Sequence, residues 1–376
     1  MGIDKIIIII MTIFMAIGGI DKIFGNKLGY GEKFEEGIMA MGSLAVAMVG
    51  IISLAPVLGN ILTPIVGPIY SALGADPAMF ATTLLANDMW GAPLALGMAK
   101  NPEAGRLAAF ILGSMMGPTI VFTIPVALGI IEKDDKPFLA KGILAGITTI
   151  PLGVLAGGLV AGFPIGLILV NLIPIIIVAA LIILGLIFMP EKMTKGFAVF
   201  GQGVVIVITL GLIVAIIQAS VEGLTIIPGM DSIFTEYKNQ ELVKGGIETI
   251  GSIAIVLAGA YPLVHFITKV FGKPLEVLGK GLGMNEAGAA GLVATLANNI
   301  PMFGILKDMD ANGKVMNIAF AVSAAFVFGD HLGFTAGFDG GKYTQMIFPM
   351  IVGKLVAGVT AIIVAKILFC KKETAK

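Results

Sequence analysis

Residues 164–189, PIGLILVNLIPIIIVAALIILGLIFM, decide the fold class because no position in them carries a charge. An α-helix needs about 20 apolar residues to cross a hydrocarbon core of roughly 30 Å. This stretch therefore predicts a transmembrane helix, and comparable stretches bring the number of predicted full-length crossings to nine. The predicted crossings lie near residues 3–24, 78–99, 106–131, 138–162, 164–189, 196–219, 287–306, 314–338 and 344–369.

The composition of the whole chain supports the same fold class. Of its 376 residues, 57% are hydrophobic and 13% are charged, and the mean hydropathy is +1.01. A soluble domain usually carries about 25% charged residues. The charged residues collect in short clusters between the apolar stretches, so no soluble domain fits between them. We therefore expect an all-α polytopic membrane protein whose partner is the lipid bilayer.

The sequence disfavours several classes of chemistry. The formal net charge is +0 and the single arginine is Arg106, so a nucleic-acid partner is not expected. The single cysteine, Cys370, excludes a disulfide within the chain. The two histidines, His265 and His331, lack the spacing of metal ligands, and the sequence has no phosphate-binding loop of the G-x-x-x-x-G-K-[ST] type. We expect no metal, no cofactor and no catalytic residue.

Two further apolar intervals, residues 36–73 and 245–282, are too long for one crossing each. Residues that interrupt a transmembrane helix lie in the middle of both intervals. They are Pro56, Asn60 and Pro64 in the first and Pro262 and His265 in the second. We predict that both intervals are re-entrant hairpins, which enter the membrane and return to the same side. If they cross instead, the chain has eleven crossings, so the prediction is about 9–11 transmembrane segments.

The chain also contains an internal repeat. Three strings recur in the same order: GIMAMGSLA at Gly37 as GIETIGSIA at Gly246, LLANDMWGAPLALGM at Leu84 as ATLANNIPMFGILKDM at Ala294, and GPTIVF at Gly117 as GDHLGF at Gly329. Their offsets of about 209, 211 and 212 residues predict two homologous halves, residues 34–131 and 243–338. Such repeats are typical of secondary transporters, whose substrate site lies near the bilayer midplane where the halves meet.

The relative orientation of the halves depends on the number of crossings between their starts. If both long intervals are hairpins, five crossings separate the halves, and an odd number inverts the second half. If both intervals cross, the number is six and the halves are parallel. The positive-inside rule, applied with Lys371 and Lys372 in the cytoplasm, favours the hairpins only slightly. We predict inverted repeats within one transmembrane transporter domain, residues 1–376.

A broken helix in each half is the strongest signal of a site. Asn87 and Asp88 lie at the centre of one apolar stretch, and Asn298 and Asn299 lie at the corresponding place in the second half. A proline follows each pair closely. A helix that breaks within the membrane frees backbone carbonyls and amides, which usually line a cavity or bind a ligand. We expect these residues to line the transport path. The alternative is that the asparagines cap half-helices and Asp88 pairs with a lysine.

A second pair of helix breaks adds three candidate site residues. They are Thr119 in the first half and Asp330 and His331 in the second. A carboxylate at membrane depth is costly unless it is paired or faces water, so Asp330 is a candidate counter-charge for a cation. Alternatively, Asp330 accepts a hydrogen bond from His331 and fixes a kink. His331 is also a candidate proton carrier. Trp90 and Tyr261 lie near breaks and are candidates for stacking on a bound cation, although such aromatic residues as often serve packing.

Eight strings carry a resemblance to a known family. They are EEGIMAMG at Glu35, LLANDMWG at Leu84, LGSMMGPTIVFTIPVALGIIE at Leu112, PEKM at Pro190, VATLANNIPMFG at Val293, AFAVSAAF at Ala319, GDHLGF at Gly329 and MIFPMIVGKLVAGVTAI at Met346. These long, ordered strings resemble the EutH family of ethanolamine utilisation permeases over almost the whole chain. The chain departs from some members between Gly162 and Ile168, where they carry a polar loop and this chain has a nearly minimal connection.

The resemblance implies a carrier, not an enzyme, that imports ethanolamine across a bacterial cytoplasmic membrane. It also implies that a cobalamin-dependent ammonia-lyase, usually housed in a microcompartment, then uses the ethanolamine as a carbon and nitrogen source. Ethanolamine is mostly an ammonium ion at neutral pH, so its charge bars free passage through the bilayer. We expect Asp88, ahead of Asp330, to supply the counter-charge, and an amide such as Asn298 or Asn299 to bind the hydroxyl. The sequence leaves open whether the carrier forms a homo-oligomer.

Two other functions stay open on the sequence alone. A carrier with two hairpins and inverted repeats would also resemble concentrative nucleoside transporters, so transport of another small polar solute such as a nucleoside is the first alternative. The second is an intramembrane enzyme that uses Asp88 and Asp330 as an aspartyl pair, although the two acids lie at non-equivalent points of the repeat. The coupling ion, whether proton, sodium or none, is also open.

Overall fold

The computed structural model of the chain describes residues 2–238 and 241–370. In these residues the secondary structure is helical except for one antiparallel pair of strands, β1 (Glu236–Lys238) and β2 (Glu241–Val243). The long helices are α1 (Ile3–Ile23), α2 (Tyr30–Ala72), α8 (Lys136–Val160), α9 (Ile165–Phe188), α10 (Pro190–Ser220), α11 (Gly246–Gly281) and α16 (Ile347–Leu368). The short helices are α3 (Ala78–Leu84), η1 (Asn87–Gly91), α4 (Ala92–Met98), α5 (Pro102–Arg106), η2 (Leu107–Ile111), η3 (Leu112–Ser114), α6 (Met116–Pro118), η4 (Thr119–Thr123), α7 (Ile124–Ile130), η5 (Lys133–Asp135), α12 (Glu286–Ala297), α13 (Asn299–Gly304), η6 (Leu306–Asp308), α14 (Ala311–Ala324), α15 (Asp330–Gly337), η7 (Phe338–Gly341) and η8 (Thr344–Met346).

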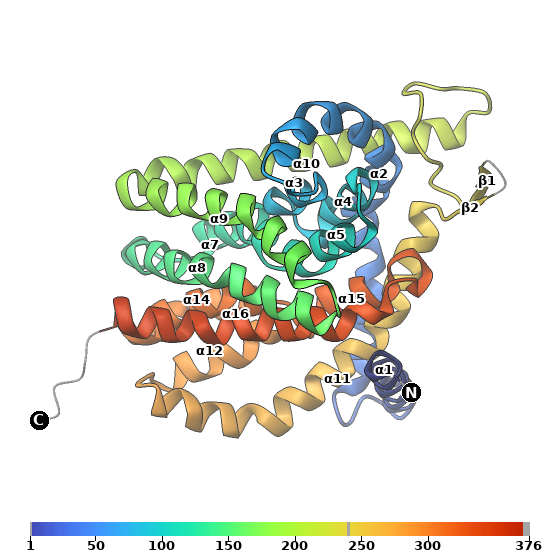
Figure 1. Cartoon of the computed structure of the whole chain (residues 1–376). Coiled ribbons are helices and arrows are strands. Elements are labelled where there is room, and N and C mark those ends of the chain that lie inside the picture. The colour runs from blue at the N-terminus through green and yellow to red at the C-terminus, as the bar shows by residue number, and fades with distance from the viewer. Residues whose placement is uncertain (1, 239–240, 371–376) are drawn as a thin grey trace, which may run out of the picture.

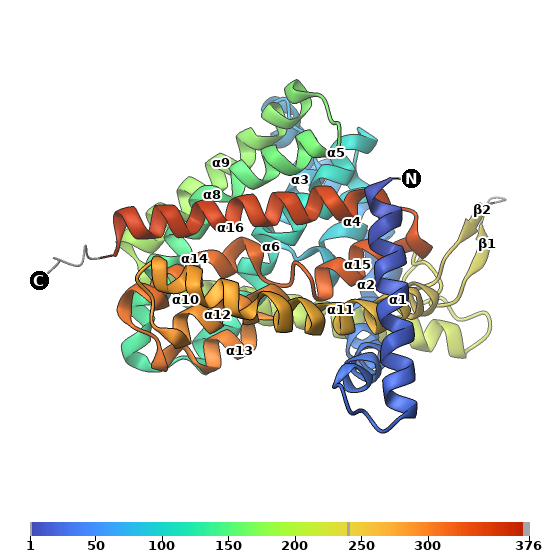
Figure 2. The same cartoon turned by 90° about the horizontal axis from the view of Figure 1, so that it is seen from below.

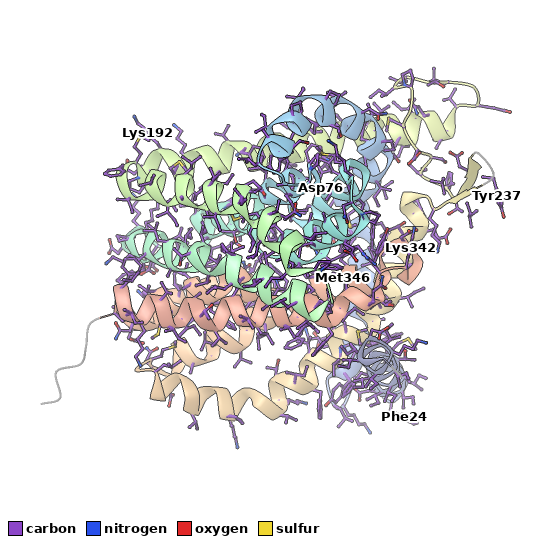
Figure 3. All side chains as sticks on the ribbon, in the orientation of Figure 1. Phe24, Asp76, Lys192, Tyr237, Lys342 and Met346 are labelled. Carbon is purple, nitrogen blue, oxygen red and sulfur yellow. The ribbon has the colours of Figure 1, made fainter. Side chains whose placement is uncertain are left out.

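Eight helical segments in the described residues are long and apolar enough to cross a membrane. They are Ile3–Ile23, Tyr30–Ala72, Pro102–Ile130, Lys133–Val160, Ile165–Phe188, Pro190–Ser220, Gly246–Val270 and Thr344–Leu368. Large apolar side chains cover their outer faces, and Leu181 on α9 is 61% exposed, as expected for a residue that faces lipid. Polar residues such as Lys192 and Tyr237 lie at opposite ends of the long helices (Figure 3). The prediction of an all-α polytopic membrane protein is confirmed.

The helices α8, α9, α10 and α16 lie side by side, and α1 runs across their direction (Figures 1 and 2). Small residues permit the closest contacts between them: a Cβ built on Gly153 of α8 would lie 2.5 Å from the carbonyl oxygen of Gly353 on α16. Thr149 Oγ1 lies 2.9 Å from the carbonyl oxygen of Ala357, also on α16. Close packing of small residues and hydrogen bonds between helices hold a bundle together in lipid.

The two long intervals that the sequence predicts to be hairpins are continuous helices. α2 has 43 residues and α11 has 36, so at about 1.5 Å per residue each is longer than the roughly 30 Å hydrocarbon core. Pro56, Pro64 and Pro262 lie inside these helices. Each proline removes one backbone hydrogen bond and bends its helix without reversing it, and α2 bends over at the top of Figure 1. The prediction of hairpins at residues 36–73 and 245–282 is therefore wrong.

A hairpin does occur in the first half, but it is formed by residues 78–98. The Asp76 carboxylate accepts hydrogen bonds from the backbone amides of Ala78 at 2.9 Å, Lys100 at 3.0 Å and Asn101 at 2.8 Å. The chain thus leaves this loop along α3 and returns to it along η1 and α4.

Residues 286–304 form the matching hairpin in the second half. The backbone amide of Asn285 donates to Asp310 Oδ1 at 2.8 Å, and Asn285 Nδ2 donates to the carbonyl oxygen of Asp308 at 2.8 Å. The chain leaves along α12 and returns along α13. The full crossings predicted at 78–99 and 287–306 are therefore wrong, because two half-helices joined by a short tip have the length and apolar content of one crossing.

The predicted crossing near residues 314–338 is present as a broken helix. α14 starts at the loop that holds Asn285, beyond the end of α11. α15 ends at Gly337, where an added Cβ would lie 2.6 Å from Ile253 near the start of α11. This segment therefore runs the length of α11. Together with the eight long segments, the described residues contain nine apolar segments long enough to cross a membrane, and two hairpins.

α2 and α11 pack against each other as an antiparallel pair. A Cβ built on Gly37 of α2 would lie 2.5 Å from the backbone nitrogen of Ala258 on α11. At the other end of the contact, a Cβ on Gly246 of α11 would lie 3.1 Å from Val49 of α2. An early residue of each helix thus meets a later residue of the other. The broken segment 102–130 packs at the centre of the molecule, and nearly all of its most apolar stretch is buried.

Candidate functional site

The tip of the first hairpin places polar groups in the interior of the protein. Leu85 and Ala86 have extended backbones, with ψ of 139° and 144°, and η1 begins directly after them as a π-helix at Asn87. The Asn87 side chain is fully buried, and neither of its amide atoms has a hydrogen-bond partner among the described residues. Asp88, the next residue, lines a cavity. The predicted helix break is confirmed, and it delivers a carboxylate to a cavity inside the protein.

The tip of the second hairpin is built differently. Asn298 is extended, with ψ of 141°, and its Oδ1 accepts a hydrogen bond of 2.8 Å from the amide of Ile300. This contact caps α13, which is the structural alternative considered from the sequence. Asn299 is fully buried, and its Nδ2 donates to Thr123 Oγ1 at 3.0 Å. The second tip is thereby tied to the broken helix of the first half.

Each hairpin tip packs on the second break of its own half through a glycine. A Cβ on Gly117 would lie 1.9 Å from the carbonyl oxygen of Leu85, and one on Gly329 would lie 2.2 Å from that of Ala297. No side chain fits at such distances, so these glycines permit backbone-to-backbone contact. Thr119 Oγ1 lies 2.9 Å from the carbonyl oxygens of both Met115 and Val322, and so links the two broken helices.

A cavity of about 190 Å³, here called the central cavity, lies where these breaks meet. It is lined by Ser43, Leu44, Ala47, Ala86, Asp88, Met89, Pro118, Phe122, Phe326, Asp330 and His331. Two carboxylates and an imidazole are thus surrounded by apolar and aromatic side chains. Phe326 adopts a left-handed backbone with φ of 64°, a strained conformation for a large residue that is often found at functional sites.

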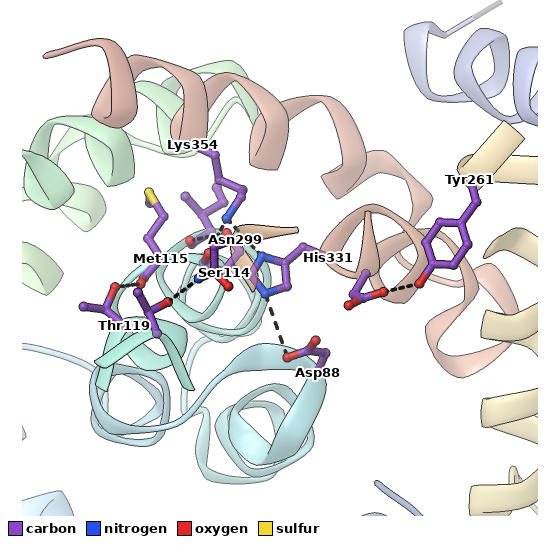
Figure 4. A network of polar contacts seen from close by, with 11 residues as sticks. Asp88, Ser114, Met115, Thr119, Tyr261, Asn299, His331 and Lys354 are labelled. Atoms are coloured by element: carbon purple, nitrogen blue, oxygen red, sulfur yellow. Dashed lines mark hydrogen bonds and ion pairs between the residues drawn. The ribbon is translucent and has the colours of Figure 1, made fainter. Parts of the chain in front are cut away.

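A buried lysine approaches the central cavity from α16 (Figure 4). Lys354 is 1% exposed, and its Nζ donates to the Ser114 carbonyl and lies 3.0 Å from His331 Nδ1. A protonated Lys354 can only donate, so in that state Nδ1 is the acceptor and the proton of His331 lies on Nε2. His331 Nε2 lies 3.9 Å from Asp88 Oδ1. His331 therefore lies between Lys354 and Asp88, and its distance to Asp88 is too long for a hydrogen bond.

In the structure the partner of Asp330 is Tyr261 and not His331, the partner considered from the sequence. Its Oδ1 accepts a hydrogen bond of 2.5 Å from the hydroxyl of Tyr261 on α11 (Figure 4), and no contact with His331 is described for it. Asp330 also borders a second cavity of about 280 Å³, here called the Glu36 vestibule. That vestibule is lined by Lys33, Glu36, Tyr261, Val264, His265, Thr268, Val293, Ala294, Ala297, Asn298, Pro301 and Asp330.

A third and larger cavity of about 660 Å³, here called the Asn60 vestibule, lies farther along α2. It is lined by Ile52, Ala55, Pro56, Gly59, Asn60, Thr63, Pro64, Pro93, Leu96, Gly97, Asp231, Lys244, Thr249, Phe338, Asp339 and Tyr343. Along α2 the order is the Glu36 vestibule, then the central cavity beside Ser43, then the Asn60 vestibule. The smallest of the three cavities thus holds the two partly buried acids and lies between two wider ones.

Comparison with known proteins decides the family. Residues 3–368 match the family described as "Ethanolamine utilisation protein, EutH". The chain belongs to the EutH family. A relative from Listeria monocytogenes, named "Probable ethanolamine permease EutH", is 66% identical over 364 residues, which cover 97% of this chain and 94% of the relative. A relative of the same name from Escherichia coli is 53% identical over 402 residues, which cover 99% of this chain and 97% of the relative.

A further EutH relative shows that the likeness extends beyond proteins with that name. The "Uncharacterized protein YxeR" of Bacillus subtilis is 51% identical over 361 residues, which cover 96% of this chain and 94% of the relative. No solved structure matches the chain. The family assignment therefore rests on sequence along nearly the whole chain, and the architecture rests on the structure described above.

In this EutH family member, the predicted site residues fall into two groups. Asp88, Asp330 and His331 meet at the central cavity, and Asn298 lies in the neighbouring Glu36 vestibule. The others do not line the central cavity: they are Asn87, Trp90, Thr119 and Asn299. The four residues of the hairpin tips do not line one cavity, because Asp88 lies at the central cavity, Asn298 at the Glu36 vestibule, and Asn87 and Asn299 at neither. Whether any of these residues binds substrate stays a prediction.

Sequence reasoning missed Lys354 as part of the site. The signal was present, because a lysine in the middle of a membrane helix is costly unless it is paired or faces water. Its partners Ser114 and His331 lie 240 and 23 residues away in the chain, so no local pattern connects them.

Proposed function

We propose that this EutH family member carries ethanolamine, as ethanolammonium, across the bacterial cytoplasmic membrane through the central cavity. Relatives that cover nearly the whole chain are named probable ethanolamine permeases, and the chain is a multi-pass membrane protein. The observation that carries the proposal is the meeting of two carboxylates, Asp88 and Asp330, in one small cavity inside a protein with several candidate membrane-spanning helices. Buried acids in a membrane are rare and usually mark the path of an ion or a polar solute. On this proposal the protein is a permease and catalyses no covalent reaction.

The chemistry of the central cavity fits ethanolammonium. The ammonium group has only hydrogen-bond donors, which suits the carboxylates of Asp88 and Asp330. Phe122 and Phe326 offer aromatic faces to the cation and apolar contact to the two-carbon chain. Ser43 Oγ donates to the Ala40 carbonyl at 2.9 Å and keeps its oxygen lone pairs, so it replaces the asparagine amides as the proposed acceptor for the ligand hydroxyl.

The size of the central cavity favours a very small solute over a nucleoside. At about 190 Å³ it is smaller than the roughly 300–1,000 Å³ of pockets that enclose drug-sized ligands. The cavity wall also carries two acids and few neutral hydrogen-bonding groups, whereas a nucleobase needs several neutral donors and acceptors along its edge. Ethanolamine fits both the small volume of the central cavity and the negative charge of its two acids.

The proposal includes an inverted relation between residues 34–131 and 243–338. At an offset of 209 residues, Gly37 is equivalent to Gly246 and Val49 is equivalent to Ala258. The contact of Gly37 with Ala258 is therefore the counterpart of the contact of Gly246 with Val49. An antiparallel pair of equivalent membrane-crossing helices supports inversion of one half relative to the other. On this proposal each hairpin returns to its own side, so an odd number of crossings separates the starts of the two halves.

The same inversion supports alternating access between two sides of the membrane. The wall of the Asn60 vestibule at Ile52, Ala55, Pro56 and Gly59 corresponds, at the same offset, to the wall of the Glu36 vestibule at Tyr261, Val264, His265 and Thr268. On this proposal the two vestibules open to opposite sides. With the C-terminus in the cytoplasm, Lys5, Lys100, Arg106, Lys238, Lys244 and Lys342 lie outside. The other lysines of the described residues, except the buried Lys354, then lie on the cytoplasmic side, in agreement with the positive-inside rule.

The test is uptake of labelled ethanolamine and labelled uridine by purified protein in proteoliposomes. We expect saturable uptake of ethanolamine above that of protein-free liposomes, and no protein-dependent uptake of uridine. Preferred uptake of uridine would favour the nucleoside alternative, and equal uptake by liposomes with and without protein would overturn the proposal.

A further inference from the structure

The charged groups around the central cavity do not balance. Asp88 and Asp330 line the cavity, and Lys354 reaches it through His331. His331 is neutral when its Nδ1 accepts from a protonated Lys354. With both carboxylates ionised and Lys354 protonated, one negative charge is left without a counter-charge.

Among the described residues, groups on the neighbouring elements do not supply the missing positive charge. The residues that line the central cavity from α2 and from the two breaks are uncharged apart from the acids and His331. Tyr261 on α11 contributes a neutral hydroxyl to Asp330. In the Glu36 vestibule, Lys33 Nζ lies 2.5 Å from Glu36 Oε2, so this pair adds no net charge. His265 at the same vestibule packs its ring against Tyr30 at 5.1 Å between centroids.

An uncompensated charge is costly to keep in a membrane interior and costly to move across it. During a transport cycle the cavity must nevertheless open first to one side of the membrane and then to the other. It makes one of these changes with substrate bound and the return change without substrate. Ethanolammonium neutralises the cavity in one direction. In the other direction a cation of the same charge must take its place, and the simplest one that the carboxylates accept is a proton.

We infer that the chain exchanges one ethanolammonium for one proton, so that net transport is that of the neutral amine; this inference rests on the proposed function. At the outer side, the protonated carboxyl group releases its proton to the medium as the ammonium binds to the resulting carboxylate. At the inner side, a cytoplasmic proton binds to the carboxylate as ethanolammonium leaves. The sum of the cycle is one ethanolammonium in and one proton out, and charge is conserved at each step.

Lys354 has a defined place in this exchange. Its Nζ lies within hydrogen-bonding distance of the Ser114 carbonyl and of His331 Nδ1, and in the proposed exchange it stays protonated as a fixed cation. It compensates one of the two carboxylates permanently and leaves a requirement for a single mobile cation. Without Lys354 the empty cavity would need two mobile cations.

Electroneutral exchange makes a thermodynamic prediction that a uniporter of ethanolammonium does not share. In the exchange, the final distribution of ethanolamine follows the pH gradient and is independent of the membrane potential. A uniporter that carries the cation alone accumulates it about tenfold for each 59 mV of inside-negative potential. The two mechanisms therefore differ in what drives accumulation.

The experiment uses wild-type protein in proteoliposomes that contain a pH-sensitive dye and a potassium gradient with valinomycin to set the potential. We expect protein-dependent uptake of labelled ethanolamine, alkalinisation of the lumen by one proton equivalent per ethanolamine, and no effect of the potential on the final distribution. Protein-free liposomes measure the leak of the free base, which is subtracted. Uptake that accumulates with the potential would overturn the inference while leaving the proposed function intact. Absence of protein-dependent uptake would overturn both.

The variant Asp330→Asn tests the charge count itself. It removes one carboxylate, so Asp88 and Lys354 balance and the empty cavity needs no proton. We expect residual ethanolamine uptake to become dependent on the potential and to lose its proton stoichiometry. Asp134→Asn, an exposed acid, is the control and should behave as wild type. A variant that still moves one proton per ethanolamine would overturn the charge count, and the wild-type measurement decides the question if the variant does not fold.

Discussion

The substitution Asp88→Asn tests the proposed ammonium site at the carboxylate that the first hairpin tip delivers. The substitution keeps the shape of the side chain and removes its charge. Asp88 has a side chain that is 17% exposed and lies 3.9 Å from His331 Nε2. It is therefore accessible from the cavity but largely shielded from water, so its charge should be felt strongly by a bound cation.

The expected magnitude follows from the distance at which an ammonium group would lie from this carboxylate. At about 4 Å and an effective dielectric constant of about 20, the attraction is roughly 4 kcal/mol. Measured losses on removing one partner of a buried charge pair are about 2–5 kcal/mol. At about 1.4 kcal/mol per factor of ten, the affinity for ethanolamine should fall by roughly 30-fold to several thousand-fold.

The assay is equilibrium binding of labelled ethanolamine to purified protein, together with uptake at micromolar ethanolamine. The matched control is Asp134→Asn, which removes an exposed carboxylate and should leave both quantities unchanged. Thermal unfolding in detergent shows whether the variant is folded. If folded Asp88→Asn binds ethanolamine within about threefold of wild type, which is less than 1 kcal/mol, this carboxylate is not the counter-charge.

Three further predictions concern the architecture. Gly117→Ala should lower the melting temperature in detergent and the yield of folded protein, because its Cβ would lie 1.9 Å from a backbone oxygen, whereas Gly129→Ala meets nothing within 4 Å and should be neutral. Tyr261→Phe removes a hydrogen bond to a carboxylate worth about 1.5–3 kcal/mol, so it should lower the melting temperature; an unchanged value would contradict the contact. In a background without the native cysteine, Lys100→Cys should react with an impermeant maleimide from outside and Lys133→Cys only from inside, and the opposite pattern would contradict the proposed topology.

The transmembrane character of the chain was predictable because it depends on local composition. Any stretch like residues 164–189 must be in lipid or in a protein core, whatever the rest of the chain does. The helix breaks at Asn87 and Asn298 were predictable for the same reason, since polar residues and a nearby proline disturb a helix wherever it lies. These features need no knowledge of tertiary contacts.

The assignment of hairpins and crossings was not predictable from length and breakers. Residues 36–73 contain prolines, but a helix supported by neighbours tolerates them as bends. The apolar stretch 78–99 has the length of one crossing, yet it folds back because Asp76 binds the backbone of Lys100 and Asn101. Such a contact closes a loop in three dimensions, and the sequence shows only that polar residues lie at both ends.

The candidate site was predictable in its acids and not in its connections. Asp88, Asp330 and His331 stand out because ionisable residues are rare in apolar stretches. The role of Lys354 depends on the packing of α16 against elements far away in the chain, and the hydroxyl of Tyr261 finds Asp330 across 69 residues. The asparagines were given too large a role, because a buried amide serves equally well as a helix cap or as a link between helices.

The most direct test of the central claim is competition for ethanolamine uptake by ethylene glycol, which has a similar size and shape but carries a hydroxyl in place of the ammonium group. If Asp88 and Asp330 select the cation, unlabelled ethanolamine should abolish uptake of the label in proteoliposomes, and ethylene glycol at the same concentration should have no effect. The expected difference in affinity is at least about 30-fold, from the loss of a buried charge interaction of about 2 kcal/mol or more. Equal competition by the two compounds would contradict the account, because recognition would then not depend on the ammonium charge.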